Sequence, residues 1–199
     1  MTRFLYIADT HLGANPMGYE QQKGYPEKLS EILAGLARFL SPEHGIDFVL
    51  HGGDMIDSST DENILAAAEV FDLPVPVYLC LGNHDLTVPD AVARWVKLAP
   101  GFFKDGKPDC TIMTNDCVIH VAPNHWDEIP FFWGDRQDAR LSASQIAHLS
   151  SQLGAMPHLP HIVLTHSPVH GLPVMQTGFP EPYHCPNTSF TAGMAALVA

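Results

Sequence analysis

The sequence has few basic residues. Ten Lys and Arg stand against 22 Asp and Glu in 199 residues, which gives a formal net charge of −12. This charge opposes non-specific binding to a phosphate backbone, so nucleic acid is not an expected partner. It suits a soluble protein, or one whose carboxylates collect cations. A homo-oligomer remains open.

Long apolar runs are also missing. No stretch approaches the roughly 20 residues of a membrane-spanning helix, so we expect no membrane association. Asp9 interrupts the first apolar run too early for a secretion signal.

The four cysteines contain no CxxC pair, which favours idle thiols in a reducing, cytoplasmic location. The 46% apolar content predicts an ordinary core, in a single domain spanning residues 1–199.

Short apolar runs alternate with helical patterns along the chain. Four continuous runs are typical of strands covered on both faces: 4–8, 48–50, 77–81 and 162–164. Helices are predicted over 25–40, 61–71, 89–99 and 141–153, the last with Ser142 and Gln145 placed as a capping box. Residues 110–123 predict two strands about a turn. We therefore expect a layered α/β fold, with central mixed β-sheets flanked by helices.

Polar residues cluster directly after each of the four runs. The clusters contain, in chain order, Asp9 and His11; Asp54 and Asp57; Asn83, His84 and Asp85; and His166 and His170. Because ligands of open α/β sheets gather beyond the carboxyl ends of the strands, we expect these side chains to meet at one edge. His51, which precedes the second cluster, is interpreted as an ordinary histidine.

These residue types suit a particular chemistry. Carboxylate, imidazole and amide groups without thiolates form a mixed oxygen and nitrogen shell for two divalent ions, Mn, Fe or Zn. Asp54 is the natural shared ligand, since an aspartate can bridge two cations. Two ions about 3.5–4 Å apart can clamp a phosphoryl group and turn a bridging water into hydroxide.

At these residues the sequence resembles the calcineurin-like metallophosphoesterase superfamily. It matches the pattern D-x-H, G-D-x-x-D, G-N-H-D and a lone histidine after a strand. The matching stretches are DTH at residues 9–11, GDMID at 53–57, GNHD at 82–85 and LTHSP at 164–168. The resemblance implies a metallophosphoesterase fold and a hydrolase that acts on a small phosphoester, either a diester or a monoester.

The resemblance also implies roles for individual residues. Asp9 and His11 would hold the first metal, and Asp54 would bridge to the second, which Asn83 and His166 also bind. His84 would face the substrate and protonate the departing alkoxide. Asp85 would orient the His84 imidazole from behind, as carboxylates commonly do.

One family motif has no match. No G-H-x-H follows His166, although in the family this motif supplies a histidine to each metal. We expect the C-terminal strands of the family to be missing from these 199 residues. His170 and His184 are weak candidates for replacing the motif, because neither has the paired spacing.

Three functions stay open. The helical pattern at 141–153, just before the His166 strand, resembles the cyclic-nucleotide type of phosphodiesterase. The DTHLG stretch at 9–13 instead resembles the nucleases of double-strand-break repair, but the sequence has no basic run. The absent G-H-x-H leaves a catalytically impaired metal-binding module as the third. Aromatic residues within 126–133 could stack on a substrate base or cover the sheet.

Overall fold

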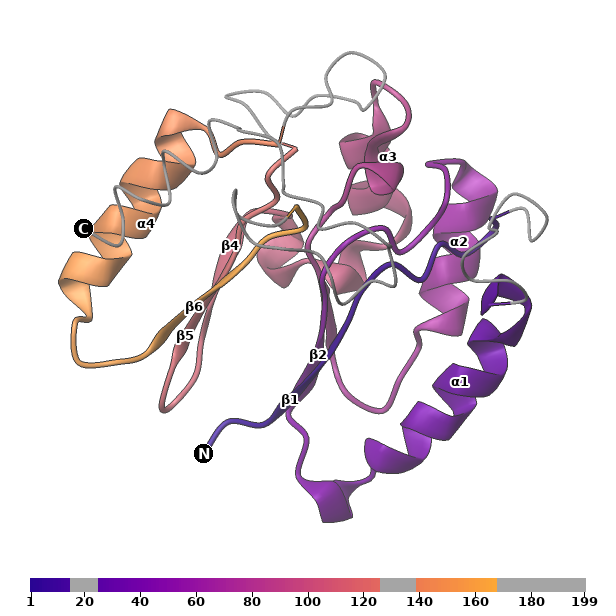
Figure 1. Ribbon diagram of the computed structural model, residues 1–199, viewed down its shortest axis with the longest axis horizontal. Coiled ribbons are helices and arrows are strands. Elements are labelled where there is room, and N and C mark those ends of the chain that lie inside the picture. Colours follow the sequence, from indigo (N-terminus) through magenta and orange to yellow (C-terminus); the bar gives the residue numbers. More distant parts are fainter. Residues whose placement is uncertain (15–24, 126–138, 168–199) are drawn as a thin grey trace, which may run out of the picture.

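The computed structural model describes residues 1–14, 25–125 and 139–167, with the side chains of the first helix described from Lys28. Two three-stranded sheets lie at its centre, with helices on their outer faces (Figure 1). The strands are β1 (Phe4–Ile7), β2 (Phe48–His51), β3 (Val77–Leu79), β4 (Cys110–Met113), β5 (Val118–Val121) and β6 (His161–Leu164). The α-helices are α1 (Tyr25–Phe39), α2 (Asp61–Val70), α3 (Ala91–Leu98) and α4 (Ala143–Ala155). The mixed α/β fold with helix-flanked sheets confirms the predicted class.

The first sheet is parallel, in the order β1-β2-β3. Successive side chains of a strand point to opposite faces, so each strand serves two layers. Val49 faces a core shared with α1, α2 and α3, whereas Phe48 and Leu50 face the second sheet. This double burial explains why β2 reads as a continuous apolar run.

The second sheet is mixed, as the sequence predicted. Strands β4 and β5 form a hairpin in which Cys110 lies opposite Val121 and Met113 lies opposite Val118. Strand β6 then pairs with β5 in parallel. Cys110 and Cys117 are both free thiols in this hairpin.

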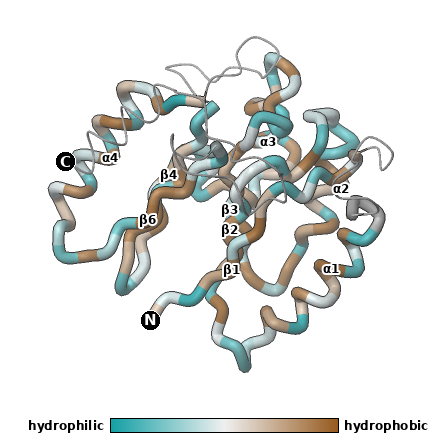
Figure 2. Tube along the Cα trace, viewed as in Figure 1, coloured by the Kyte–Doolittle hydropathy of each residue, from teal (hydrophilic) through white to brown (hydrophobic). Residues whose placement is uncertain are grey.

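Three apolar layers hold the elements together, and Figure 2 shows the strands as mostly hydrophobic. The middle layer lies between the sheets and joins Leu50 and Cys80 to Ile119 and Leu164. Helix α4 covers the outer face of the second sheet through Leu149. Among the described residues, no helix has the length and apolar character needed to cross a membrane.

One expectation from the sequence requires correction. The four predicted strands do not share one sheet edge, because β6 belongs to the second sheet and β1, β2 and β3 to the first. The packing of the sheets through Leu50, Cys80 and Leu164 brings their carboxyl ends together. Residues after β6 therefore reach the site across the interface between the sheets.

Candidate metal centre

Three of the predicted metal ligands have an unusual backbone. Asp9, His11 and Asp54 have φ angles of 57°, 41° and 52°, in the left-handed region. This conformation costs an L-residue on the order of 1–2 kcal/mol, so the surrounding structure must hold each residue in place. Strained backbone of this kind concentrates at functional sites.

Backbone hydrogen bonds join the loops after β1 and β2. The amides of Asp9, His11 and Leu12 donate to the carbonyl oxygens of Gly53, Asp54 and Met55, each at 2.9 Å. Parallel pairing thus continues past the strand ends. It brings the Asp9–His11 segment alongside Asp54.

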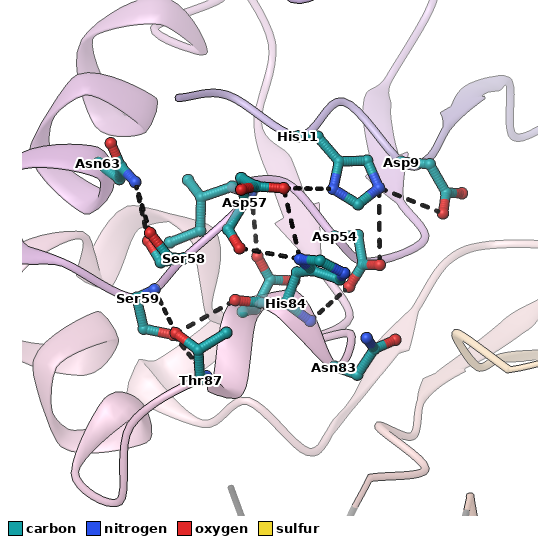
Figure 3. Close-up of polar contacts among 12 residues, drawn as sticks. Asp9, His11, Asp54, Asp57, Ser58, Ser59, Asn63, Asn83, His84 and Thr87 are labelled. Atoms are coloured by element: carbon teal, nitrogen blue, oxygen red, sulfur yellow. Dashed lines mark hydrogen bonds and ion pairs between the residues drawn. The ribbon is translucent and has the colours of Figure 1, made fainter. Parts of the chain in front are cut away.

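Asp54 lies at the centre of a metal-ligand cluster, and only 6% of its side chain is exposed (Figure 3). The other members of this cluster are Asp9, His11, Asn83, His84 and His166. The Oδ2 atom of Asp54 lies 3.7 Å from His11 Nε2 and 3.3 Å from His166 Nε2. The Oδ1 atom of Asp54 accepts a 2.8 Å hydrogen bond from the His84 amide. Burial alone would raise the pKa of Asp54, but the hydrogen bonds and charges of His166 and His84 together outweigh burial and lower it.

His166 connects Asp54 to Asn83. Its Nδ1 lies 2.9 Å from the Gly52 carbonyl oxygen, which can only accept, so Nδ1 carries a hydrogen. The ring is thereby oriented with Nε2 toward Asp54 and 3.1 Å from Asn83 Oδ1. A backbone carbonyl on the far nitrogen is the usual arrangement for a histidine that binds a metal. Burial opposes protonation, but Asp54 and Asp9 raise the pKa of His166 to about 9.

The remaining predicted ligands, Asp9 and His11, complete the cluster. Asp9 is half exposed, and its Oδ1 lies 4.0 Å from Nε2 of the buried His11. Burial, together with the charge of Asp54, raises the pKa of the Asp9 carboxyl against the opposing effect of His166. Burial lowers the pKa of His11.

Glycine is required where the loops pass these side chains. A Cβ atom at Gly53, whose φ is 107°, would lie 2.5 Å from His166 Nδ1. A Cβ atom at Gly82 would fall against Asp54 Oδ1. The glycines of HGGD and GNHD therefore allow the close approach of the backbone to the cluster.

His84 lies beside His11, with ring centroids 4.7 Å apart in an edge-to-face arrangement. Its Nδ1 donates to the Asp57 carbonyl oxygen at 2.8 Å and lies 3.5 Å from Asp57 Oδ1. The same carboxylate oxygen lies 3.5 Å from His11 Nδ1. Asp57 thus contacts two histidines of the cluster, while about a third of the His84 side chain stays exposed.

The predicted role of Asp85 requires correction. Asp85 is fully buried, and its carboxylate accepts hydrogen bonds from the amides of Met55, Ile56 and Gly82 at 2.9–3.2 Å. It therefore ties the loops after β2 and β3 together and makes no hydrogen bond to the His84 ring. In the 3-10 helix η3 (His84–Leu86), neighbouring side chains point about 120° apart, so they cannot face the same way. Asp57 takes the position expected of Asp85.

The donor atoms fit divalent cations. Two groups each have ligand atoms within 4.8 Å of one another: His11, Asp54 and His84, and Asp9, Asp54 and His166. Asp54 belongs to both groups. Carboxylate and imidazole donors, with the Asn83 amide oxygen adjacent, are ligand types that bind divalent metal ions.

Two polar residues after β5, Asn124 and His125, were not predicted from the sequence as part of the site. The Asn124 side chain donates to the Ser167 carbonyl oxygen and accepts from the Ser167 amide, both at 3.1 Å. Nε2 of His125 lies 3.0 Å from Ser167 Oγ. Both residues are buried and hold the residue that follows His166. The sequence does carry a signal for them, because Asn124 and His125 follow the apolar run of β5 just as the predicted ligands follow their strands.

Some candidates lie outside the described residues. His170, His184 and the aromatic residues within 126–133 belong to this group. The five predicted ligands and His84 all lie within the described residues, and the other four ligands and His84 gather around Asp54.

The family model for calcineurin-like phosphoesterases matches residues 2–189 of this chain. No protein of curated function shows significant similarity to the sequence. Among solved structures, the NAD nucleotidase (NadN) of Haemophilus influenzae is similar at 13% identity and a TM-score of 0.44. The alignment covers 82% of this chain and 34% of that one, so the chain spans about a third of the nucleotidase. The protein of unknown function AQ665 from Aquifex aeolicus is 16% identical, with a TM-score of 0.41 and 83% and 90% of the two chains covered.

Proposed function

The chain belongs to the calcineurin-like phosphoesterase family, a family of metal-dependent phosphoester hydrolases, and from this premise we propose that it hydrolyses a small phosphoester at a dinuclear metal centre. One observation carries the proposal: a single carboxylate, Asp54, lies within 4 Å of histidines from two separate loops. A shared carboxylate between two sets of donors is what a pair of bridged cations requires.

The proposed ligands are those of the cluster. Following the family resemblance, Asp9 and His11 would hold one cation, Asn83 and His166 the other, and Asp54 both. The Asp9 carboxylate also lies within 4.8 Å of the ligand atoms of Asp54 and His166. Divalent cations at such a site supply the positive charge that activates a water molecule near neutral pH and neutralises phosphoryl oxygens. The Nδ1–H of His166, donated to Gly52, keeps Nε2 directed at the cluster.

His84 is the proposed general acid. In its charged form each ring nitrogen carries a proton, and Asp57 accepts the one on Nδ1. The Nε2 proton passes to the oxygen that leaves phosphorus, which returns the imidazole to its neutral form. About a third of the His84 side chain is exposed, which supports a role in contact with a substrate.

A hydrolysis assay tests the proposal. The protein is incubated with Mn²⁺ and bis(p-nitrophenyl) phosphate, and H84A is compared with H158A, a control at an exposed histidine outside the cluster. We expect H84A to lower kcat by about 10²- to 10⁴-fold, the contribution of a general acid, and H158A to leave it unchanged. Full activity of H84A would refute the assigned role.

Within this reaction class we propose a small diester or monoester as the substrate, and the sequence resembles the cyclic-nucleotide type of phosphodiesterase. The net charge of −12 supports a small substrate over DNA. Hydrolysis of a cyclic nucleotide, with no cleavage of single-stranded DNA at low salt, is the expected result. Preferential cleavage of DNA would favour the nuclease alternative, whereas one weakly held ion without turnover would favour a metal-binding module.

The free thiols in the described residues support a cytoplasmic location.

A further inference from the structure

Two buried polar side chains lie between the loops that carry the cluster. Thr10 separates Asp9 from His11, and His51 ends β2. Both have 0% exposure. One edge of the His51 ring faces Gly53 and the opposite edge faces Thr10, while Phe71 packs edge-to-face at a centroid distance of 5.4 Å.

Three hydrogen bonds run through these side chains in one direction. The Gly53 amide lies 3.3 Å from His51 Nδ1 and can only donate, so Nδ1 accepts. At the other end the Met55 carbonyl oxygen can only accept, so the Thr10 hydroxyl donates to it at 2.9 Å. Thr10 Oγ1 then has to accept from His51 Nε2, 3.0 Å away. Both ends therefore determine the state of the ring, which is neutral with its hydrogen on Nε2.

Burial supports the same assignment. It lowers the pKa of His51 to about 3, and the charge of His166 acts in the same direction. A neutral imidazole offers one acceptor and one donor on opposite edges of a rigid ring. An apolar side chain here would leave the Gly53 amide and the Thr10 hydroxyl with fewer partners in a fully buried place, which is costly.

The attachment points of these bonds flank the three strained residues. Gly53 and Met55 are the neighbours of Asp54, and Thr10 lies between Asp9 and His11. Each residue with a positive φ angle among the proposed ligands is therefore adjacent to a residue that takes part in these hydrogen bonds. The backbone hydrogen bonds between the two loops set their pairing, and the side chains of His51 and Thr10 add a further link between them.

We propose that His51 and Thr10 form a positioning relay that holds the Asp9–His11 segment against Asp54 and thereby tightens the binding of divalent cations. This inference rests on the proposed function, because it assigns the relay to the same metal centre. His51 and Thr10 act through the ligands that they hold.

The test removes one hydroxyl from the full chain. T10V keeps the shape of the side chain without the hydroxyl, and T10S keeps the hydroxyl. Mn²⁺ affinity is measured by calorimetry, and kcat and KM for bis(p-nitrophenyl) phosphate are measured at saturating Mn²⁺. We expect T10V to weaken Mn²⁺ binding about 10- to 100-fold, the usual effect of losing an outer partner, while kcat at saturating Mn²⁺ falls far less. T10S restores the affinity to within about twofold of the unmodified protein.

Other outcomes separate the hypotheses. If T10V binds Mn²⁺ as tightly as the unmodified protein, or only loses thermal stability, the relay has no positioning role. If the unmodified protein neither binds Mn²⁺ nor hydrolyses the diester, the proposed function fails instead. Nitrogen-15 NMR of the unmodified protein tests the relay even where T10V does not fold: a hydrogen on Nε2 of His51 is expected, and a hydrogen on Nδ1 would overturn the proposal.

Discussion

The Nε2 atom of His166 lies 3.3 Å from Oδ2 of Asp54, although the two residues follow strands of different sheets. Asp54 follows β2 and His166 follows β6, and the two residues are 112 positions apart in the sequence. The apolar layer between the sheets, which includes Leu50 and Leu164, makes the contact possible. The candidate metal centre therefore depends on the packing of the two sheets.

Replacement of Asp54 by asparagine tests this central position. D54N keeps an oxygen for the His84 amide but loses the charge that two cations would share. We expect Mn²⁺ affinity and kcat/KM to fall by more than about 100-fold, since loss of an outer partner alone costs 10- to 100-fold. Calorimetry and the diester assay measure both. D61N is the control, because Asp61 is exposed and pairs with Arg94. Equal metal binding by D54N and D61N would contradict the shared-ligand assignment.

Asp57 is expected to act on His84. D57N removes the charge 3.5 Å from His84 Nδ1 but leaves the Asp57 carbonyl oxygen that accepts from this nitrogen. A neutral partner stabilises an imidazolium less, so we expect kcat to fall about 10- to 100-fold with a smaller change in KM. Steady-state kinetics at saturating Mn²⁺ provide the measurement. An unchanged kcat would show that the ring needs only the carbonyl.

Asp85 is expected to act on stability. D85A leaves three buried amides, those of Met55, Ile56 and Gly82, without their shared acceptor. Each unpaired buried group costs about 1–3 kcal/mol, so the free energy of unfolding should fall by at least about 3 kcal/mol. Urea denaturation measures the change, with D57A as the comparison, because Asp57 is partly exposed. A loss in D85A no larger than that in D57A would contradict this role.

A chain of polar side chains joins α4 to the second sheet. His161 Nε2 donates to the Met156 carbonyl oxygen, so its Nδ1 accepts from His120 Nε2 at 3.0 Å. His120 Nδ1 then accepts from Thr111, which in turn accepts from the exposed His148. Burial, together with the neighbouring His161 and His148, lowers the pKa of His120 to about 4.

This lowered pKa predicts a pH dependence of stability. His120 binds a proton below about pH 6.5 in the unfolded chain, but only below about pH 4 in the folded chain. The contribution of the neutral His120 to the free energy of unfolding is thus fully present above about pH 6.5 and is lost as the pH falls toward 4. His120 is buried, with 1% exposure, and one pKa unit corresponds to about 1.4 kcal/mol, so the loss is on the order of 1–3 kcal/mol.

The matched variant is H120Q, which keeps a donor toward His161 but cannot take up a proton. Urea denaturation at pH 7.5 and 4.5 should show a larger loss of stability in the unmodified protein than in H120Q. Effects of pH at the metal centre are common to both proteins and cancel in the comparison. Identical losses in the two proteins would mean that His120 does not contribute.

Local patterns determined much of the fold. The apolar runs marked β1, β2, β3 and β6, and the hairpin of β4 and β5 formed where two such runs flank a turn. The capping box of Ser142 and Gln145 forms at the start of α4 as expected. These features depend on residues a few positions apart, which is why the sequence alone indicates them. The polar residues after the strands were identifiable for the same reason.

Only the tertiary structure decided how these side chains meet. The sequence could not reveal that β6 lies in a second sheet, since that depends on which apolar faces pack together. Nor could it separate Asp57 from Asp85, because the direction of a side chain depends on the turn that carries it. The link between Thr10 and His51 likewise joins residues 41 positions apart. Such contacts form only after the strands pair, since pairing brings distant loops within hydrogen-bonding distance.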